Sequence, residues 1–404
     1  MSTLLLLEMV TSNPVLSLPL LSELMQRLLA VFLTVILLLA TVNGVAAGPM
    51  VAPASTTLDS QTQHEAKPGF STSSNGSLPI FTFQTSFSIL VPCTMTPRIQ
   101  PPAHQAPPVR TIIATPMENG TYPVILFKHG FNLANCFYTQ LFEYLASSGY
   151  IVIAPQVLTL SSDCSREIDE TAKMANWIVE SLAGVLNEAM PSVSVVPNVS
   201  KLVMAGHSRG GKVAFALATG KMRATGLPSF SALVTLDPVD SMAADVVVIP
   251  QMVKAGCNHT DNTLSIPILI LGTGYGGKRS GPFETGPPCA PASCSHEGYF
   301  NCSSSPLMYH FSALEYGHLD FLDDSNIWTS LVCASGISKV LLRNFSGRLI
   351  VAFLQATLEG NEEDMDYILK NWGEIDAIKL AEPQIYRADE LSNAAFKNFK
   401  SHKI

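Results

Sequence analysis

The sequence predicts an α/β fold in which helices cover both faces of a mainly parallel central sheet. From Leu78 onward, short and almost continuously apolar stretches alternate with longer stretches of helical periodicity. Continuous apolar runs are typical of strands that are buried on both faces. Hydrophobic residues make up 47% of the 404 residues and charged residues only 14%, which suits a large core and excludes a disordered chain.

The elements follow in chain order. A predicted strand is a compact apolar run that ends at a turn residue, as the run 151–154 ends at Pro155. The predicted strands are 81–91, 110–114, 124–128, 151–154, 201–205, 232–236 and 266–271. A predicted helix shows the helical period and a stop signal, such as Gly149 after the first helix. The predicted helices are 134–148, 165–190, 210–221 and 346–359.

Four segments make up the predicted organisation. Residues 1–47 are a signal-like hydrophobic N-terminus, and residues 48–77 are a linker rich in Pro, Ala, Ser, Thr and Gln. Residues 78–360 form the α/β domain. Residues 361–404 are charged and helix-like, and we expect them to be an extension outside the core.

The N-terminus has the parts of a secretory signal. One basic residue, Arg27, precedes the apolar run 28–42, and small residues follow at 44–47. The run is short for a membrane span, which needs about 20 apolar residues. Met25 is a possible true start, because a signal rarely begins so far into a chain. A membrane anchor that is not cleaved is the alternative.

Two further features agree with secretion. Six N-x-S/T triplets are candidate glycosylation sites, at Asn75, Asn119, Asn198, Asn258, Asn301 and Asn344. Eight cysteines permit up to four disulfides, and buried free thiols are the alternative. They are scattered rather than closely paired, so we expect no zinc site.

The net charge of −8 and the absence of a dense Lys/Arg run argue against nucleic acid as a partner. Nothing in the sequence implies an obligate protein partner.

The strongest motif is Gly206-His207-Ser208-Arg209-Gly210, which follows the strand 201–205 and precedes a helix. G-x-S-x-G in this context is the nucleophile elbow of the α/β-hydrolase fold. The serine sits on a sharp turn, so the residues two positions away on either side must be glycine. We therefore predict that Ser208 is the nucleophile of an acyl-transfer reaction, which needs a neighbouring base.

In this fold the acid and then the histidine follow the serine along the chain. His318 lies in a small turn before the closing helix and is the predicted base, with His310 as its rival. We expect His259 and His296 to be solvated loop residues.

The acid is less obvious, because the strand 266–271 runs into Gly272-Thr273-Gly274 without a carboxylate. One strand earlier, the strand 232–236 runs into Asp237-Pro238-Val239-Asp240. We predict that Asp237 orients the imidazole, with Asp240 as the alternative.

His129-Gly130-Phe131 follows the strand 124–128, where this fold supplies an oxyanion donor. The predicted donors are the backbone N–H groups of Phe131 and Arg209. We expect His129 to brace this loop. Candidates for lining a substrate pocket are His129, Leu133 and Phe137, although the last two could equally be packing residues.

With these motifs in hand, the chain resembles the chlorophyllase family over roughly residues 80–360. The stretches that carry the resemblance are 127–131, 149–156, 206–212, 237–240, 288–291 and 316–320. The resemblance implies a serine carboxylic-ester hydrolase with Ser208, Asp237 and His318 as its triad. It implies an apolar small-molecule ester as substrate, with chlorophyll cleaved to chlorophyllide and phytol, and no cofactor. Plant relatives would be in plastids, whereas this N-terminus looks secretory.

Two other functions remain open from the sequence. The same triad would serve a secreted lipase or a general carboxylesterase. A non-catalytic binding protein on the same fold is disfavoured, because nucleophile, acid, base and oxyanion loop are all present.

Overall fold

The computed structural model describes residues 77–85, 101–159, 161–221, 226–243, 246–279, 286–324, 332–373 and 375–388. The predicted signal segment, the linker up to residue 76 and Asn75 lie outside these residues. So does the end of the chain after residue 388.

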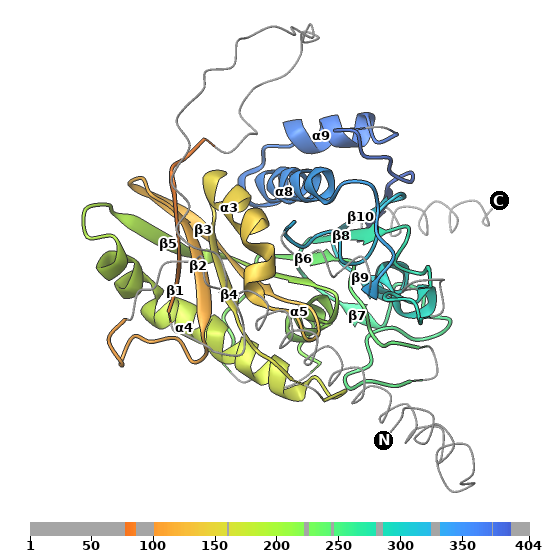
Figure 1. Cartoon of the computed structure of the whole chain (residues 1–404), viewed down its shortest axis with the longest axis horizontal. Helices are drawn as coiled ribbons and strands as arrows, with labels where there is room; N and C mark the ends of the chain where they lie inside the picture. The colour runs from red at the N-terminus through yellow and green to blue at the C-terminus, as the bar shows by residue number, and fades with distance from the viewer. Residues whose placement is uncertain are drawn as a thin grey trace, which may run out of the picture. The chain divides into compact units, whose positions relative to one another are not determined.

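Nine strands form one sheet in the order β1-β2-β4-β3-β5-β6-β8-β10-β11 (Figure 1). The strands are β1 (Ile80–Gln84), β2 (Thr111–Pro116), β3 (Gly120–Lys128), β4 (Ile151–Pro155), β5 (Val195–His207), β6 (Ala232–Leu236), β8 (Ile268–Thr273), β10 (Leu307–Ala313) and β11 (Gln384–Arg387). The six central strands from β4 to β10 run parallel, and β1, β2 and β11 are antiparallel to their neighbours. A separate parallel pair joins β7 (Asn262–Thr263) to β9 (Ser303–Ser304).

Helices cover both faces of this sheet, as Figure 1 shows. One face carries α3 (Thr139–Ser147), α8 (Lys339–Leu354) and α9 (Glu363–Lys370), and the other carries α4 (Ser165–Ala189), α5 (Arg209–Ala218) and α6 (His296–Cys302). The strand β5 displays the expected alternation: Val203 joins the core on the α3 and α8 side, whereas Met204 joins the core on the α4 and α5 side. The predicted α/β-hydrolase fold with its mainly parallel sheet is confirmed.

The segment after residue 360 differs from the expectation of an extension outside the core. Met365 and Ile368 lie three residues apart on α9, and both are buried in the core that α3 and α8 share. The strand β11 then pairs with β10, which places Gln384 opposite His310. The charges of this segment lie on the outer side of a short amphipathic helix, so composition alone concealed its inner face.

Between described residues, one disulfide joins Cys257 to Cys302 and another joins Cys289 to Cys333. Cys164 and Cys294 are buried free thiols. Within the described part of the chain, no helix is long and apolar enough to cross a membrane.

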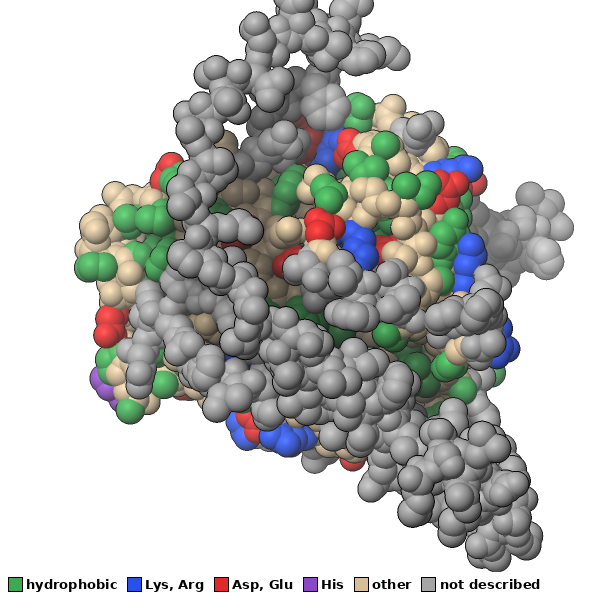
Figure 2. Space-filling model, viewed as in Figure 1, with side chains coloured by type: hydrophobic (Ala, Val, Ile, Leu, Met, Phe, Trp, Pro, Cys, Tyr) green, Lys and Arg blue, Asp and Glu red, His purple; other side chains and the backbone are tan. Residues whose placement is uncertain are grey.

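On the face drawn in Figure 2, Lys and Arg side chains are scattered among Asp and Glu side chains. The described part of this face has no continuous basic area. The expectation that nucleic acid is not a partner stays a prediction.

Candidate active site

Ser208 lies at the turn between β5 and α5. Its backbone has φ 58° and ψ −127°, a conformation that residues with a side chain rarely adopt. A Cβ atom at Gly206 would lie 2.3 Å from the carbonyl oxygen of Gly210, and a Cβ at Gly210 would lie 2.0 Å from the carbonyl oxygen of Lys128. Both glycines are therefore required by the tightness of the turn.

The structure brings Ser208, His318 and Asp237 into one hydrogen-bonded line. His318 Nε2 lies 2.8 Å from Ser208 Oγ, and His318 Nδ1 lies 2.7 Å from Asp237 Oδ2. The residues are 8%, 4% and 0% exposed, respectively, so the line is shielded from bulk water. This is the arrangement in which a histidine takes the proton of a serine while a carboxylate fixes its tautomer.

The turn that carries His318 is held by a carboxylate two residues later. Asp320 Oδ2 accepts hydrogen bonds from the backbone N–H groups of Gly317, at 2.6 Å, and Gly336, at 2.7 Å. A Cβ atom at Gly317 would lie 1.7 Å from the carbonyl oxygen of Ala334, so only glycine fits here. The Gly-His-Leu-Asp stretch thus positions the imidazole through its own flanking residues.

Asp237 stands at the end of β6 with a positive φ of 40°. Besides His318, its carboxylate accepts from the Thr273 backbone N–H at 3.1 Å and from the Thr273 hydroxyl at 2.8 Å. Burial acts to raise the pKa of Asp237, but the hydrogen bond and charge of His318, helped by His296, outweigh burial and lower it. The carboxylate is therefore ionised at neutral pH.

Asp240, the alternative acid, lies in a different environment. Its carboxylate is 2.9 Å from the buried ammonium of Lys212 and accepts from the N–H groups of Met252 and Val253 at 3.1 Å each. These bonds hold the connection after β6 to α5, and no hydrogen bond joins Asp240 to His318.

His310, the rival base, is likewise engaged away from Ser208. Its ring bonds His296 at 2.7 Å on one side and Gln384 at 2.6 Å on the other. His296 is only 5% exposed, so the expectation that it is a solvated loop residue is wrong. Its Nε2 lies 3.9 Å from Asp237 Oδ1, and a Cβ atom at Gly272 would fall 2.1 Å from its ring. Because Gly272 has no side chain, the end of β8 leaves room for this imidazole.

A cavity of about 700 Å³ adjoins these two histidines. Thr273, His296, His310 and Gln384 contribute to its lining, and Ser208 and His318 do not. It therefore borders Thr273 and His296, which contact Asp237, but not Ser208.

The predicted oxyanion loop packs directly on the elbow. A Cβ atom at Gly130 would lie 3.1 Å from Ser208 Cβ, and the Phe131 ring lies 5.0 Å below the guanidinium of Arg209. Phe131 is 39% exposed beside the serine. Among the described residues, the backbone N–H groups of Phe131 and Arg209 donate to no other protein group, which leaves both free to bind an oxyanion.

The three pocket candidates have different surroundings. His129 is only 1% exposed: its Nδ1 donates to the carbonyl of Gly130 at 2.8 Å, and its Nε2 accepts from the N–H of Val157 at 3.1 Å. The ring thus holds the loop and offers little surface to a ligand. Leu133 and Phe137 are half-buried and pack against the hydrophobic core.

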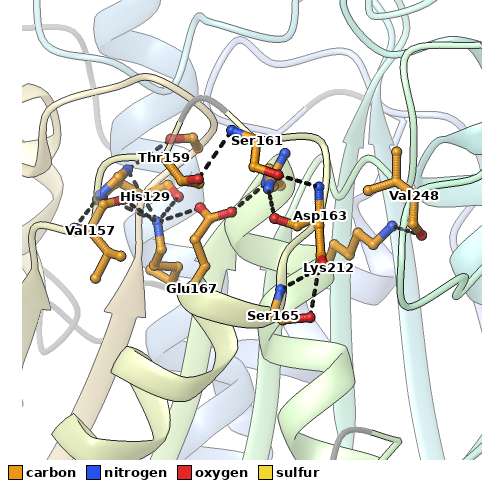
Figure 3. A network of polar contacts seen from close by, with 12 residues as sticks. His129, Val157, Thr159, Ser161, Asp163, Ser165, Glu167, Lys212 and Val248 are labelled. Atoms are coloured by element: carbon orange, nitrogen blue, oxygen red, sulfur yellow. Dashed lines mark hydrogen bonds and ion pairs between the residues drawn. The ribbon is translucent and has the colours of Figure 1, made fainter. Parts of the chain in front are cut away.

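A buried ion cluster below the loop was not anticipated from the sequence (Figure 3). Glu167 of α4 lies 3.2 Å from the ammonium of Lys128 and 2.5 Å from Nε of Arg209. Burial lowers the pKa of Lys128 to about 8, against the opposing effect of Glu167. Glu167 therefore links the end of β3, which precedes the predicted oxyanion loop, to Arg209, the residue after Ser208. Its position in an ordinary helical pattern gave no signal of this.

The candidate glycosylation sites that the structure describes differ little in exposure. Asn119, Asn258, Asn301 and Asn344 are exposed, and Asn198 is half-buried.

The model of the family described as Chlorophyllase matches residues 87–386, about three quarters of the chain. "Chlorophyllase-2" of Arabidopsis thaliana is 37% identical over 279 residues, which cover 68% of this chain and 84% of that protein. "Chlorophyllase-1" of the same plant is 37% identical over 276 residues, 66% of this chain and 81% of that protein. "Chlorophyllase-1, chloroplastic" of Citrus unshiu is 34% identical over 279 residues, 67% of this chain and 79% of that protein.

The match extends to residue 386 and so includes α9 and most of β11, in agreement with their place in the fold. It starts at residue 87 and leaves the N-terminal segments outside it. By the family match and the identity to these relatives, the chain belongs to the chlorophyllase family.

Proposed function

We propose that this protein hydrolyses the propionate ester of chlorophyll-type pigments and releases phytol, with Ser208, His318 and Asp237 as its catalytic triad. The observation that carries the proposal is the hydrogen-bonded line from Asp237 through His318 to Ser208 in a member of the chlorophyllase family. A carboxylic-ester hydrolase is the enzyme class that this family membership supports.

The reaction would proceed in two halves. His318 Nε2 removes the proton of Ser208 Oγ, which attacks the ester carbonyl carbon, and the carbonyl oxygen becomes the oxyanion. The imidazolium then protonates the departing alkoxide, so that phytol leaves and the pigment acyl group stays on the serine. A water molecule, deprotonated by the same nitrogen, attacks the acyl carbon of the acyl-enzyme. The imidazolium then returns this proton to the departing Ser208 Oγ, and the pigment acid is released.

The oxyanion would be bound by the backbone N–H groups of Phe131 and Arg209. Loss of one such donor typically costs about 2.7–4 kcal/mol of barrier. Asp237 would hold the proton on Nδ1 of His318 and stabilise the imidazolium, since its lowered pKa keeps it charged. The chain's own groups suffice for each step, so the mechanism calls for no metal or organic cofactor.

The substrate part of the proposal rests on the relatives, which are named chlorophyllases. The exposed Phe131 ring beside the serine offers an apolar surface that suits a hydrocarbon chain or a flat pigment. The test is kcat/KM for chlorophyll compared with triglycerides and short p-nitrophenyl esters. Preference for the simple esters, with no chlorophyllide formed, would instead support a lipase or general carboxylesterase on the same triad.

We further propose that the chain enters the secretory pathway and carries sugar on some of its six candidate asparagines. The signal-like residues 25–47 and the two disulfides support this route. The alternative is a plastid, as in the names of the Citrus relatives. Expression in a eukaryotic host should give a protein whose apparent mass drops on glycosidase treatment. An unchanged mass together with plastid import would overturn this assignment.

A further inference from the structure

We propose that Tyr138 and His207 are positioning residues that fix the oxyanion loop and the catalytic base relative to each other. The inference rests on the proposed hydrolysis and adds two residues to its machinery. Tyr138 ends the short helix η2 (Asn135–Tyr138), directly before α3, and His207 directly precedes the nucleophile. Both side chains are fully buried.

Three hydrogen bonds run in series through these side chains. The backbone N–H of Gly130 donates to the Tyr138 hydroxyl oxygen at 3.1 Å. That hydroxyl lies 2.7 Å from His207 Nδ1, and His207 Nε2 lies 2.8 Å from the backbone carbonyl oxygen of His318. The series therefore begins in the oxyanion loop, passes through the elbow and ends on the residue that carries the base.

Each proton in the series has one place that satisfies all of the groups. The His318 carbonyl can only accept, so His207 Nε2 must carry a hydrogen. Burial lowers the pKa of His207 to about 3, so the ring is neutral and its Nδ1 must accept. The Tyr138 hydroxyl, whose pKa burial raises, then donates to Nδ1 and uses its oxygen to accept from Gly130. A fully satisfied buried network of this kind favours a single arrangement of the elements that it joins.

Packing also connects the oxyanion loop, the His207 ring and the His318 ring. A Cβ atom at Gly130 would lie 3.2 Å from His207 Nδ1, so the loop rests on this ring. The rings of His207 and His318 lie 4.8 Å apart between centroids. A change at Tyr138 would thus reach both the Phe131 N–H, one residue from Gly130, and the imidazole that deprotonates the serine.

Tyr138→Phe keeps the aromatic ring but removes the hydroxyl, which leaves the Gly130 N–H and His207 Nδ1 without partners. A misplacement of catalytic groups by about 1 Å can cost about 100-fold in rate. We expect kcat on p-nitrophenyl butyrate to fall about 10- to 100-fold and KM to change less than twofold. The reason is that the fixed positions of the oxyanion loop and of His318 stabilise the transition state more than the bound substrate. The affinity of a trifluoromethyl ketone, which forms the oxyanion on the serine, should fall in parallel with kcat/KM.

The control is Tyr150→Phe, which removes a hydroxyl from another buried tyrosine of the same core cluster. Active-site titration with a serine-directed phosphonate corrects each rate for the fraction of folded protein. If Tyr138→Phe does not fold, His207→Phe is used, since it removes both ring nitrogens but keeps a planar side chain. Its kcat should fall at least as far.

Equal kcat and equal ketone affinity in Tyr138→Phe and Tyr150→Phe, with normal hydrolysis by the wild-type protein, would overturn this inference alone. A wild-type protein that hydrolyses no ester would overturn the proposed function and this inference with it.

Discussion

Replacing Asp237 by Asn should nearly abolish hydrolysis while leaving the fold intact. The buried carboxylate of Asp237 accepts three hydrogen bonds, one from His318 Nδ1 and two from Thr273. An amide has one oxygen, and if its NH₂ group faced the Thr273 backbone N–H, two donors would meet at a cost of about 1–3 kcal/mol. The amide oxygen therefore faces that N–H, and its NH₂ group faces His318.

In that orientation His318 Nδ1 must accept, so the proton moves to Nε2 and the ring can no longer take the proton of Ser208. The same substitution in the template Ser-His-Asp triad lowers kcat by about 10⁴. A factor of this size corresponds to about 5 kcal/mol of barrier, and we expect a comparable loss here.

The matched control is Asp240→Asn, because Asp240 is also buried and follows the same strand but pairs with Lys212. Breaking a buried ion pair costs about 3–5 kcal/mol of stability, so its thermal midpoint should fall, whereas kcat per folded molecule should stay within about threefold. The assay is p-nitrophenyl butyrate hydrolysis, with phosphonate titration of active sites and thermal unfolding of both variants. A larger loss of kcat in Asp240→Asn than in Asp237→Asn would refute the assignment of the acid.

Two further predictions concern stability. Burial lowers the pKa values of His207 and His310 to about 3, whereas an exposed histidine titrates near about 6.5. Below pH 6.5 the unfolded chain therefore binds protons that the folded protein does not, and the free energy of unfolding should fall as pH decreases toward 3. Urea unfolding between pH 7 and 4.5 checks this, and His310→Gln should flatten the slope; a pH-independent stability would contradict it. Glu167→Gln leaves the buried cations Lys128 and Arg209 without their carboxylate and should cost about 3–5 kcal/mol, whereas Glu170→Gln at the surface pair with Lys173 should cost under about 1 kcal/mol. Equal thermal midpoints for these two variants would show that the cluster does not stabilise the fold.

The parts of the site that could be predicted from the sequence are those with local signals. The elbow can be recognised in the sequence because its tight turn requires glycines at fixed offsets from Ser208. A Cβ atom added at either glycine would lie within 2.3 Å of a backbone carbonyl oxygen. The place of Asp237 beside Ser208 and His318 could be predicted because the carboxyl ends of parallel strands meet at one edge of the sheet. The place of His318 could be predicted from its order in the chain and from its small turn.

The remaining parts depend on contacts between distant residues, for which a single sequence carries no local signal. Tyr138 and His207 are 69 residues apart, and Glu167 and Arg209 are 42 apart. From the sequence, Tyr138 is an ordinary aromatic residue within the predicted helix 134–148, and Glu167 is an ordinary helix-forming residue. The strand β11 was missed because it has four residues and is mostly exposed, so no apolar alternation marks it. The pair of His296 and His310 depends on Gly272, which leaves room for the ring of His296 from the start of α6.

The measurement that tests the central claim most directly is chlorophyllide formation by the purified full-length protein and by its Ser208→Ala variant. Chlorophyll is incubated with each protein after thermal unfolding has established that both are folded, and chlorophyllide and phytol are quantified separately. We expect equal molar amounts of the two products from the wild-type protein. We expect a rate at least about 10⁴-fold lower from Ser208→Ala, because the triad acts as a unit. Chlorophyllide formation that survives in Ser208→Ala, or its absence with the wild-type protein, would contradict the account.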